Sequence, residues 1–169
     1  MILVTLGTQD KKFYRLIKEI DRLIEDGKIK DEVIVQAGSS SNYKSNRMKI
    51  LKLIPMDEFD ELVEKCDLLI THGGVGSILN GLKNNKKIIA VPRIKKYKEH
   101  VNNHQLQIVS NFSDEGYILK VEIINTLCEV IEYSKVFVPK KYVENNKKFV
   151  NDLSKEIDKY LKGWDLWIY

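Results

Sequence analysis

The segment between Thr71 and Ser77 has the composition of a phosphate-binding turn, because it reads Thr-His-Gly-Gly-Val-Gly-Ser. Its three glycines, Gly73, Gly74 and Gly76, would let the backbone approach a ligand closely and adopt angles that a Cβ atom forbids. A helix that begins near Gly76 would offer a phosphate its unpaired N–H groups and the positive end of its dipole. Ser77 would add a hydroxyl donor. A tight strand-to-helix turn without a ligand is the alternative, but such turns rarely need three glycines.

Two common classes of phosphate ligand do not fit the sequence. The chain has no G-x-x-x-x-G-K-[ST] segment, which excludes a P-loop. A dinucleotide-binding fingerprint would follow the first strand and read G-x-G-x-x-G. Here the first predicted strand leads into Gly7-Thr8-Gln9, and the glycine cluster follows the fourth predicted strand. We therefore expect no nicotinamide cofactor.

A second polar group, Asn-Asn-His-Gln at residues 102–105, opens a later predicted helix. Asn103 is of a type that favours the N-cap position. His104 and Gln105 would then point from the first turn toward the sheet edge, where they could contact sugar hydroxyls. A polar, capped helix start without a ligand remains an equal alternative. His72, beside the glycines, is open to the same two interpretations.

Metal-ligand patterns are missing from the sequence. It contains no cluster of His, Cys, Asp and Glu at ligand spacing and no Asp-x-Asp. We therefore expect neither a metal nor any other cofactor. The charge of a departing diphosphate would be balanced by helix N-termini and nearby basic groups. Arg93, Lys95 and Lys96 lie close to the predicted site in sequence.

These loops need a scaffold that brings them together, and the hydrophobic pattern predicts one. Short apolar runs alternate with amphipathic segments, which indicates a doubly wound, Rossmann-like parallel sheet with helices on both faces. Ligands bind such sheets at the carboxyl ends of the strands. Predicted strands cover 1–6, 33–37, 48–54, 68–71, 87–91 and 117–119, and predicted helices begin near 10, 58, 76, 101, 121 and 139, the second of them capped by Asp57.

Composition is that of one ordinary globular domain. The 169 residues are 43% hydrophobic and 31% charged, and the net charge of +4 is too small for a nucleic-acid-binding protein. We assign residues 1–162 to the domain and 163–169 to an aromatic tail that either docks on a partner or membrane or folds onto its own core. We expect free cysteines, no secretory signal and no membrane span.

Four blocks together resemble the C-terminal domain of the GT-B glycosyltransferase family that includes MurG. They are Val4–Thr8, Cys66–Ser77, Val91-Pro92 and Asn103–Gln105. The likeness is greatest to the split relatives of that family, the Alg13-type subunits and the similar bacterial capsule and exopolysaccharide proteins. The resemblance covers roughly residues 1 to 120 and implies a single half of a GT-B fold.

The resemblance also implies a substrate and the residues that hold it. The glycine block and the 7–9 loop would hold the diphosphate of a UDP-sugar, Met56 would pack against uracil, and His104 with Gln105 would contact the sugar. Asn80 stands where many relatives place a Glu that binds the ribose. The implied substrate-binding set is Gly7, Thr8, Gln9, Met56, Gly73, Gly74, Gly76, Ser77, Asn80, Asn103, His104 and Gln105.

The function implied is that of the catalytic, donor-binding subunit of a two-component inverting glycosyltransferase. It would move a hexose or N-acetylhexosamine to a lipid-linked acceptor in polysaccharide or glycolipid synthesis. A membrane-anchored, Alg14-like partner would supply the acceptor side and keep this chain at the cytoplasmic face of the membrane. The base would be His72, His104 or, less directly, Glu99, unless the partner provides it. The alternative is a non-catalytic nucleotide-binding subunit, which the exchange of Glu for Asn80 keeps open.

Overall fold

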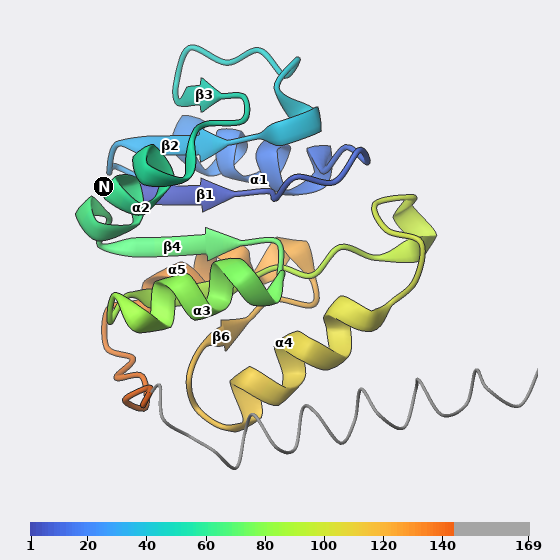
Figure 1. Ribbon diagram of the computed structural model, residues 1–169. Coiled ribbons are helices and arrows are strands. Elements are labelled where there is room, and N and C mark those ends of the chain that lie inside the picture. The colour runs from blue at the N-terminus through green and yellow to red at the C-terminus, as the bar shows by residue number, and fades with distance from the viewer. Residues whose placement is uncertain (144–169) are drawn as a thin grey trace, which may run out of the picture.

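The computed structural model describes residues 1–143, which form a six-stranded parallel sheet with helices on both faces (Figure 1). The strand order is β3-β2-β1-β4-β5-β6, so the chain winds outward in one direction from β1 and in the other from β4. The strands are β1 Ile2–Thr5, β2 Val33–Gln36, β3 Lys49–Leu51, β4 Leu68–Thr71, β5 Lys87–Ala90 and β6 Leu119–Lys120. This is the doubly wound α/β architecture that the sequence predicted.

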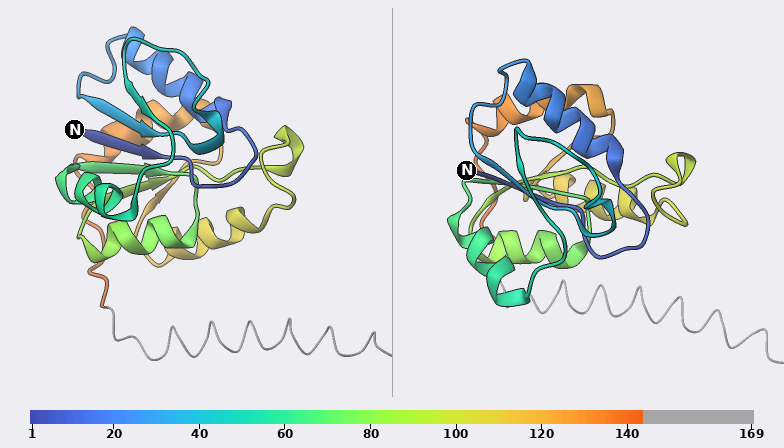
Figure 2. Two further views of the ribbon diagram at one scale, coloured as in Figure 1. Left: turned by 45° about the horizontal axis from the view of Figure 1, so that its top comes forward. Right: turned by 90° about the horizontal axis from the view of Figure 1, so that it is seen from above.

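Successive side chains of a strand point to opposite faces of the sheet, which explains the two helical layers (Figure 2). Ile2 and Val4 of β1 point to the layer of α1 and α5, whereas Leu3 points to the layer of α2, α3 and α4. Each layer therefore has its own buried apolar cluster. The helices are α1 Tyr14–Glu25, α2 Met56–Lys65, α3 Val75–Lys83, α4 His104–Asp114 and α5 Leu127–Ser134.

The central strands end at the same level, which creates the site. Thr5 at the end of β1 is in register with Thr71 of β4, and Thr71 is in register with Ala90 of β5. The direction in which successive strands are added to the sheet reverses between β1 and β4. At such a switch point of a parallel sheet, the loops leave on opposite sides and frame a crevice. The three loops that follow β1, β4 and β5 therefore meet at one edge.

Several element boundaries differ from the predicted ones. The third strand is shorter than 48–54, and the helix predicted from 101 begins only at His104. Asp57 is not a helix cap, because α2 begins at Met56 and Pro55 occupies the N-cap position. The segment predicted as a helix from residue 121 starts at Leu127, after a short 3₁₀ turn.

Two predictions, the last helix and the aromatic tail, concern residues that lie wholly or largely outside the described part of the chain. Residues 139–143 are not helical, and the rest of the predicted last helix falls beyond them. The boundary at 162 and the aromatic tail 163–169 also lie there. Among residues 1–143, no helix is both long enough and apolar enough to span a bilayer.

Candidate functional site

His72 lies where the loops after β1 and β4 meet, between a glycine of each loop, Gly7 and Gly74. An ideal Cβ added to Gly7 would come within 2.6 Å of the imidazole atoms Cε1 and Nε2, and one added to Gly74 would collide with Nε2 as well. Gly7 also has a φ of +75°, which side chains rarely adopt. Both glycines are therefore needed to accommodate the ring, which is only 7% exposed.

The protonation state of His72 follows from its neighbours. Its Nδ1 lies 3.3 Å from the carbonyl oxygen of Thr5, and a carbonyl can only accept, so this contact requires the tautomer with hydrogen on Nδ1. Nε2, between the two glycines, is then a proton acceptor. Burial, aided by the charge of Arg93, lowers the pKa of His72 to about 4. The ring is consequently neutral near pH 7.

The remaining two glycines of the turn have different roles. Gly73 has a φ of +84°, and a Cβ there would come within 2.6 Å of Cγ2 of Val109, so it allows α4 to pack closely against the turn. Gly76 has nothing within 4 Å of an added Cβ. Neither packing nor backbone geometry requires a glycine at 76, although glycine weakens a helix. The open space above it is where a ligand could approach the backbone.

The N-terminus of α3 provides donors at this point. The helix begins at Val75, and Gly74 in the N-cap position offers no side chain to satisfy its first N–H groups. Ser77 is half-buried in the first turn. Helix geometry and dipole therefore favour an anion at the turn, which is where we expect a diphosphate from the sequence.

Arg93 is a fully enclosed arginine whose role was not foreseen. Its guanidinium donates from Nη1 to the carbonyls of Lys11 and Glu99 and from Nη2 to that of Leu6, at 2.7, 3.1 and 2.7 Å respectively. It also lies 4.9 Å from the centre of the Phe13 ring. Burial lowers the pKa of Arg93 to about 10, so it stays charged at neutral pH. It joins two loops and is not free to balance a diphosphate.

Glu99 is equally committed to the protein. Both carboxylate oxygens accept hydrogen bonds from Arg15, and one also accepts the backbone N–H of Ile94. The residue is buried. Its place in this ion pair argues against the expectation that Glu99 could act as a base.

The residues of the Asn-His-Gln group have different roles. Gln105 is buried, and its Oε1 accepts the backbone N–H of Arg93 at 3.0 Å. Asn103 makes no side-chain cap, since its Oδ1 accepts the N–H of Lys95 instead. The Oδ1 of Asn102 accepts the N–H of His104 at 3.1 Å. Asn103 thus occupies the predicted N-cap position, but its side chain makes no capping hydrogen bond.

His104 is exposed to solvent, as are Asn102 and Asn103. Its Nδ1 lies 3.2 Å from Oε1 of Gln107. Together with Asn102 and Asn103 these residues line a shallow depression of about 480 Å³. The structure therefore separates His104 from the buried Gln105, rather than directing the two side chains to one ligand.

Asn80 and Met56 lie on the two helices next to the turn. Asn80 donates from Nδ2 to Oδ1 of Asp60 at 2.6 Å and accepts at its Oδ1 from Asn84 at 2.9 Å. Its amide thus cross-links α3 and α2, a partnership that the sequence did not reveal. Met56 is 67% exposed at the start of α2 and is free to pack against a flat ligand.

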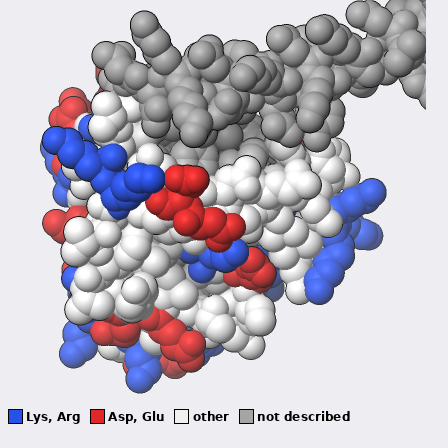
Figure 3. All heavy atoms as spheres, turned by 90° about the horizontal axis from the view of Figure 1, so that it is seen from below, with Lys and Arg blue, Asp and Glu red and all other residues white. Residues whose placement is uncertain are grey.

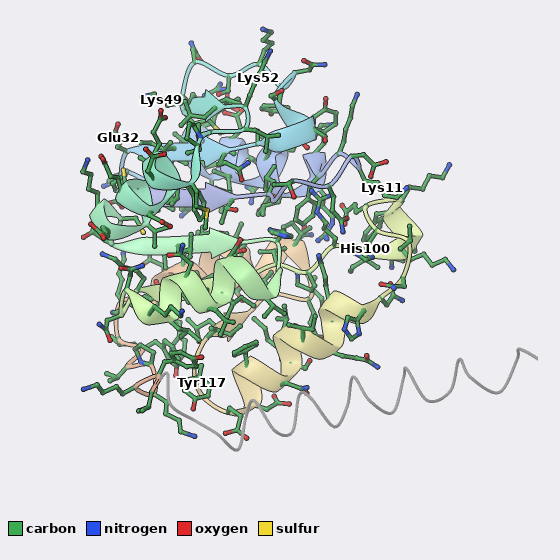
Figure 4. All side chains as sticks on the ribbon, in the orientation of Figure 1. Lys11, Glu32, Lys49, Lys52, His100 and Tyr117 are labelled. Carbon is green, nitrogen blue, oxygen red and sulfur yellow. The ribbon has the colours of Figure 1, made fainter. Side chains whose placement is uncertain are left out.

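The 7–9 loop is joined to the loop after β5. The side-chain Nε2 of Gln9 lies 3.0 Å from Nε2 of His100, which Figure 4 shows at the crevice end of the molecule. Thr8 is exposed beside this contact. Within residues 1–143, no three side chains of His, Cys, Asp or Glu gather as metal ligands would.

Comparison with known proteins identifies relatives of this chain. The UDP-N-acetylglucosamine transferase subunit ALG13 of Candida albicans is 31% identical over 81 residues, which are 48% of this chain and 26% of that protein. The UDP-N-acetylglucosamine–N-acetylmuramyl-(pentapeptide) pyrophosphoryl-undecaprenol N-acetylglucosamine transferase of Prochlorococcus marinus is 27% identical over 125 residues, 63% of this chain and 33% of that enzyme. The chain thus spans about a quarter and a third of these relatives.

A solved structure and a family model extend the match over most of the chain. The solution structure of ALG13 superposes with a TM-score of 0.57 at 21% identity, over 88% of this chain and 92% of that one, which shows a shared fold. The model described as the glycosyltransferase family 28 C-terminal domain matches residues 1–159. The chain belongs to the glycosyltransferase family 28 C-terminal domain family.

Proposed function

We propose that this chain is the donor-binding, catalytic subunit of a two-component inverting glycosyltransferase that uses a UDP-sugar. The observation that carries the proposal is the turn before α3, where uncapped N–H groups face open space above Gly76 at the reversal point of the sheet. Membership of the family and the transferase names of both relatives support it.

The donor would lie across the carboxyl edge of β4. Its diphosphate would accept hydrogen bonds from the first turn of α3 and from Ser77, where the helix dipole stabilises negative charge. Its uracil would pack on the exposed side chain of Met56, and its ribose would contact the amide of Asn80. The sugar would extend toward His104.

The reaction is a single displacement at the anomeric carbon. An acceptor hydroxyl forms the new bond from the face opposite UDP, the bond from the anomeric carbon to the diphosphate oxygen breaks, and UDP leaves with the electron pair. The hydroxyl proton passes to a base. His104, or a residue of a partner, suits this role better than His72, because a pKa near 4 makes His72 a weak acceptor. The charge on UDP is balanced by α3 without a metal.

The acceptor and the partner follow from the family resemblance. We propose a lipid-linked sugar acceptor in capsule, exopolysaccharide or glycolipid synthesis. A membrane-anchored, Alg14-like partner would bind that acceptor and keep the chain at the cytoplasmic face of the membrane.

A second candidate is a non-catalytic subunit that binds nucleotide and activates its partner. One observation favours it: both polar ends of the Asn80 amide are already engaged by Asp60 and Asn84, which leaves the ribose without a charged acceptor.

A transferase assay with a panel of UDP-sugars, with and without the partner, distinguishes the two candidates. Catalysis by this chain predicts donor consumption only in the complex and a loss of at least about 100-fold in turnover for His104→Ala, if His104 is the base. Asn111→Ala, at an exposed position further along α4, is the matched control. Unchanged turnover in both variants, with UDP binding intact, would favour the activating subunit. No consumption of any donor by the complex would refute the catalytic proposal.

A further inference from the structure

The loop at residues 94–101 projects from the carboxyl edge of the sheet and carries an unusual combination of side chains (Figures 1 and 2). Lys95, Lys96 and Lys98 are all exposed, and so are Tyr97 and Val101, at 49% and 67%. Lysines around a projecting aromatic and an apolar side chain match the anionic surface and the interfacial zone of a bilayer.

The β1–α1 loop extends the same surface. Lys12 and Lys98 line one open depression of about 600 Å³ with Tyr14, Arg15, Tyr97 and Glu99. Lys11 lies at the same end of the molecule (Figure 4). We call Lys11, Lys12, Lys95, Lys96 and Lys98, together with Tyr97 and Val101, the basic rim.

The charges of the basic rim are not neutralised by the protein itself. In the part of the chain that the structure describes, none of the five lysines forms an ion pair. Glu99, the one carboxylate in the depression, is paired with Arg15. Figure 3 shows Lys and Arg without acidic neighbours at the right-hand end of the face seen from below, the end that carries the 94–101 loop.

The backbone of the rim supplies an independent observation. Lys98 has a φ of +58°, in the left-handed region, where glycine is the favoured residue and lysine is strained. Within residues 1–143 the only other such non-glycine residue is Asn85, at +53°, and asparagine tolerates this conformation. Lys98 closes the short 3₁₀ turn Lys95–Tyr97, and lysine there costs stability that a glycine would not.

The loop is also rigid where it meets the body. Arg15 lies 5.0 Å from the Tyr97 ring and 5.2 Å from the Phe13 ring, and it donates to Glu99. Arg93 ties the base of the same loop to the β1–α1 loop. A loop held in this way presents its lysines from a preformed backbone, which lowers the ordering cost on binding.

We propose that the basic rim binds an anionic membrane surface directly, so that the chain touches the bilayer itself and does not rely on a partner alone. Each lysine near such a surface strengthens binding several-fold, and the effect fades with salt. The rim shares the edge of the sheet with the crevice, so this contact would turn the crevice toward the membrane. The contact itself does not depend on the proposed transferase function.

Vesicle sedimentation of the full chain tests the proposal, without donor or partner present. Vesicles of phosphatidylcholine containing about one third phosphatidylglycerol should bind the protein, and binding should weaken as salt rises; pure phosphatidylcholine should bind it far less. Replacing Lys95 and Lys96 by Gln and Lys98 by Gly together should weaken binding roughly 100-fold. Lys49→Gln, on the far side of the molecule, should change it less than about two-fold (Figure 4).

The single variant Lys98→Gly separates the effect of losing the charge from any effect on folding. It should weaken vesicle binding about five-fold while the midpoint of thermal unfolding stays the same or rises. Asn85→Gly makes the same backbone change without loss of charge and should leave vesicle binding unaltered. Equal binding to both kinds of vesicle, binding to neither, or full binding by the triple variant would each overturn the proposal, and the last would point to another part of the chain.

Discussion

Arg15 and Glu99 form a two-pronged ion pair across 84 residues of sequence, with Nε and Nη2 of the guanidinium 3.0 and 2.9 Å from the two carboxylate oxygens. Both side chains are largely withdrawn from solvent, at 15% and 5% exposed. The pair joins the start of α1 to the loop that carries the basic rim. It therefore fixes the 94–101 loop relative to the start of α1.

Removing the charge of Glu99 should destabilise the fold strongly. Glu99→Gln leaves Arg15 without its counter-charge in a partly buried place and should lower the free energy of unfolding by about 3 kcal/mol. Urea unfolding at neutral pH measures this. The matched control is Asp26→Asn, which breaks an exposed pair with Arg22 and should cost less than about 0.5 kcal/mol. Equal losses in the two variants would contradict the structural role of Glu99.

The glycines of the crevice should separate into two classes on substitution by alanine. Gly7→Ala places a Cβ against His72 at a φ of +75° and should destabilise the protein by more than about 2 kcal/mol. Gly76→Ala meets no atom within 4 Å and should raise stability by about 0.5–1 kcal/mol, because alanine is the better helix former.

UDP binding by the Gly76 variants then tests the site itself. If the diphosphate lies over Gly76, Gly76→Val should weaken UDP binding by at least about ten-fold in calorimetry while the protein remains folded. Gly116→Ala is the control for affinity: its φ of +80° means that the variant loses stability, but it lies far along the chain and should leave UDP affinity unchanged. Undiminished UDP binding by Gly76→Val would show that the nucleotide lies elsewhere.

The sheet and its edge could be predicted from sequence because apolar runs, glycines and helix periodicity are local signals. The crevice interior could not. Nothing in the sequence indicates that His72 fills the space left by Gly7, since the two are far apart in the chain. Charged residues are usually exposed, so the sequence does not indicate that Arg93 is buried. Its carbonyl partners become apparent only when the two loops that follow β1 and β5 are placed together.

The roles of the residues next to a helix start also could not be predicted from the sequence. Asn102 and Asn103 are adjacent and of the same residue type. Asn102 accepts the N–H of His104, whereas Asn103, in the N-cap position of α4, accepts an N–H from Lys95. The difference arises from the path of the 94–101 loop. The same path buries Gln105 and exposes His104, although both side chains were expected to contact the sugar.

The stability of the protein should depend on the protonation of His72. Its pKa is lowered from 6.5 to about 4 in the folded state, so the unfolded chain binds more protons between these values, and stability falls as pH falls. At pH 4.5 this group alone should remove about 2.5 kcal/mol relative to pH 7.5. The free energy of unfolding at the two pH values measures the loss.

Two variants assign that pH dependence to His72. His72→Gln cannot be protonated and should lose less stability on acidification than wild type by about that amount, whatever its stability at pH 7.5. His104→Gln replaces an exposed histidine and should retain the wild-type dependence. The same pH dependence in all three proteins would mean that other groups cause it.

The contact between Asn80 and Asp60 should decide how the chain holds the ribose. Asn80→Glu alone sets a carboxylate beside Asp60, and repulsion together with the loss of the 2.6 Å hydrogen bond should lower stability by about 1–2 kcal/mol. Adding Asp60→Asn should restore most of the loss, because an amide can again donate to a carboxylate. A charged acceptor is then available for the ribose diol, and UDP affinity should rise several-fold above wild type. Calorimetry with UDP and with deoxy-UDP, which lacks one hydroxyl, measures the gain; an equal rise for both nucleotides, or none for either, would place the ribose away from residue 80.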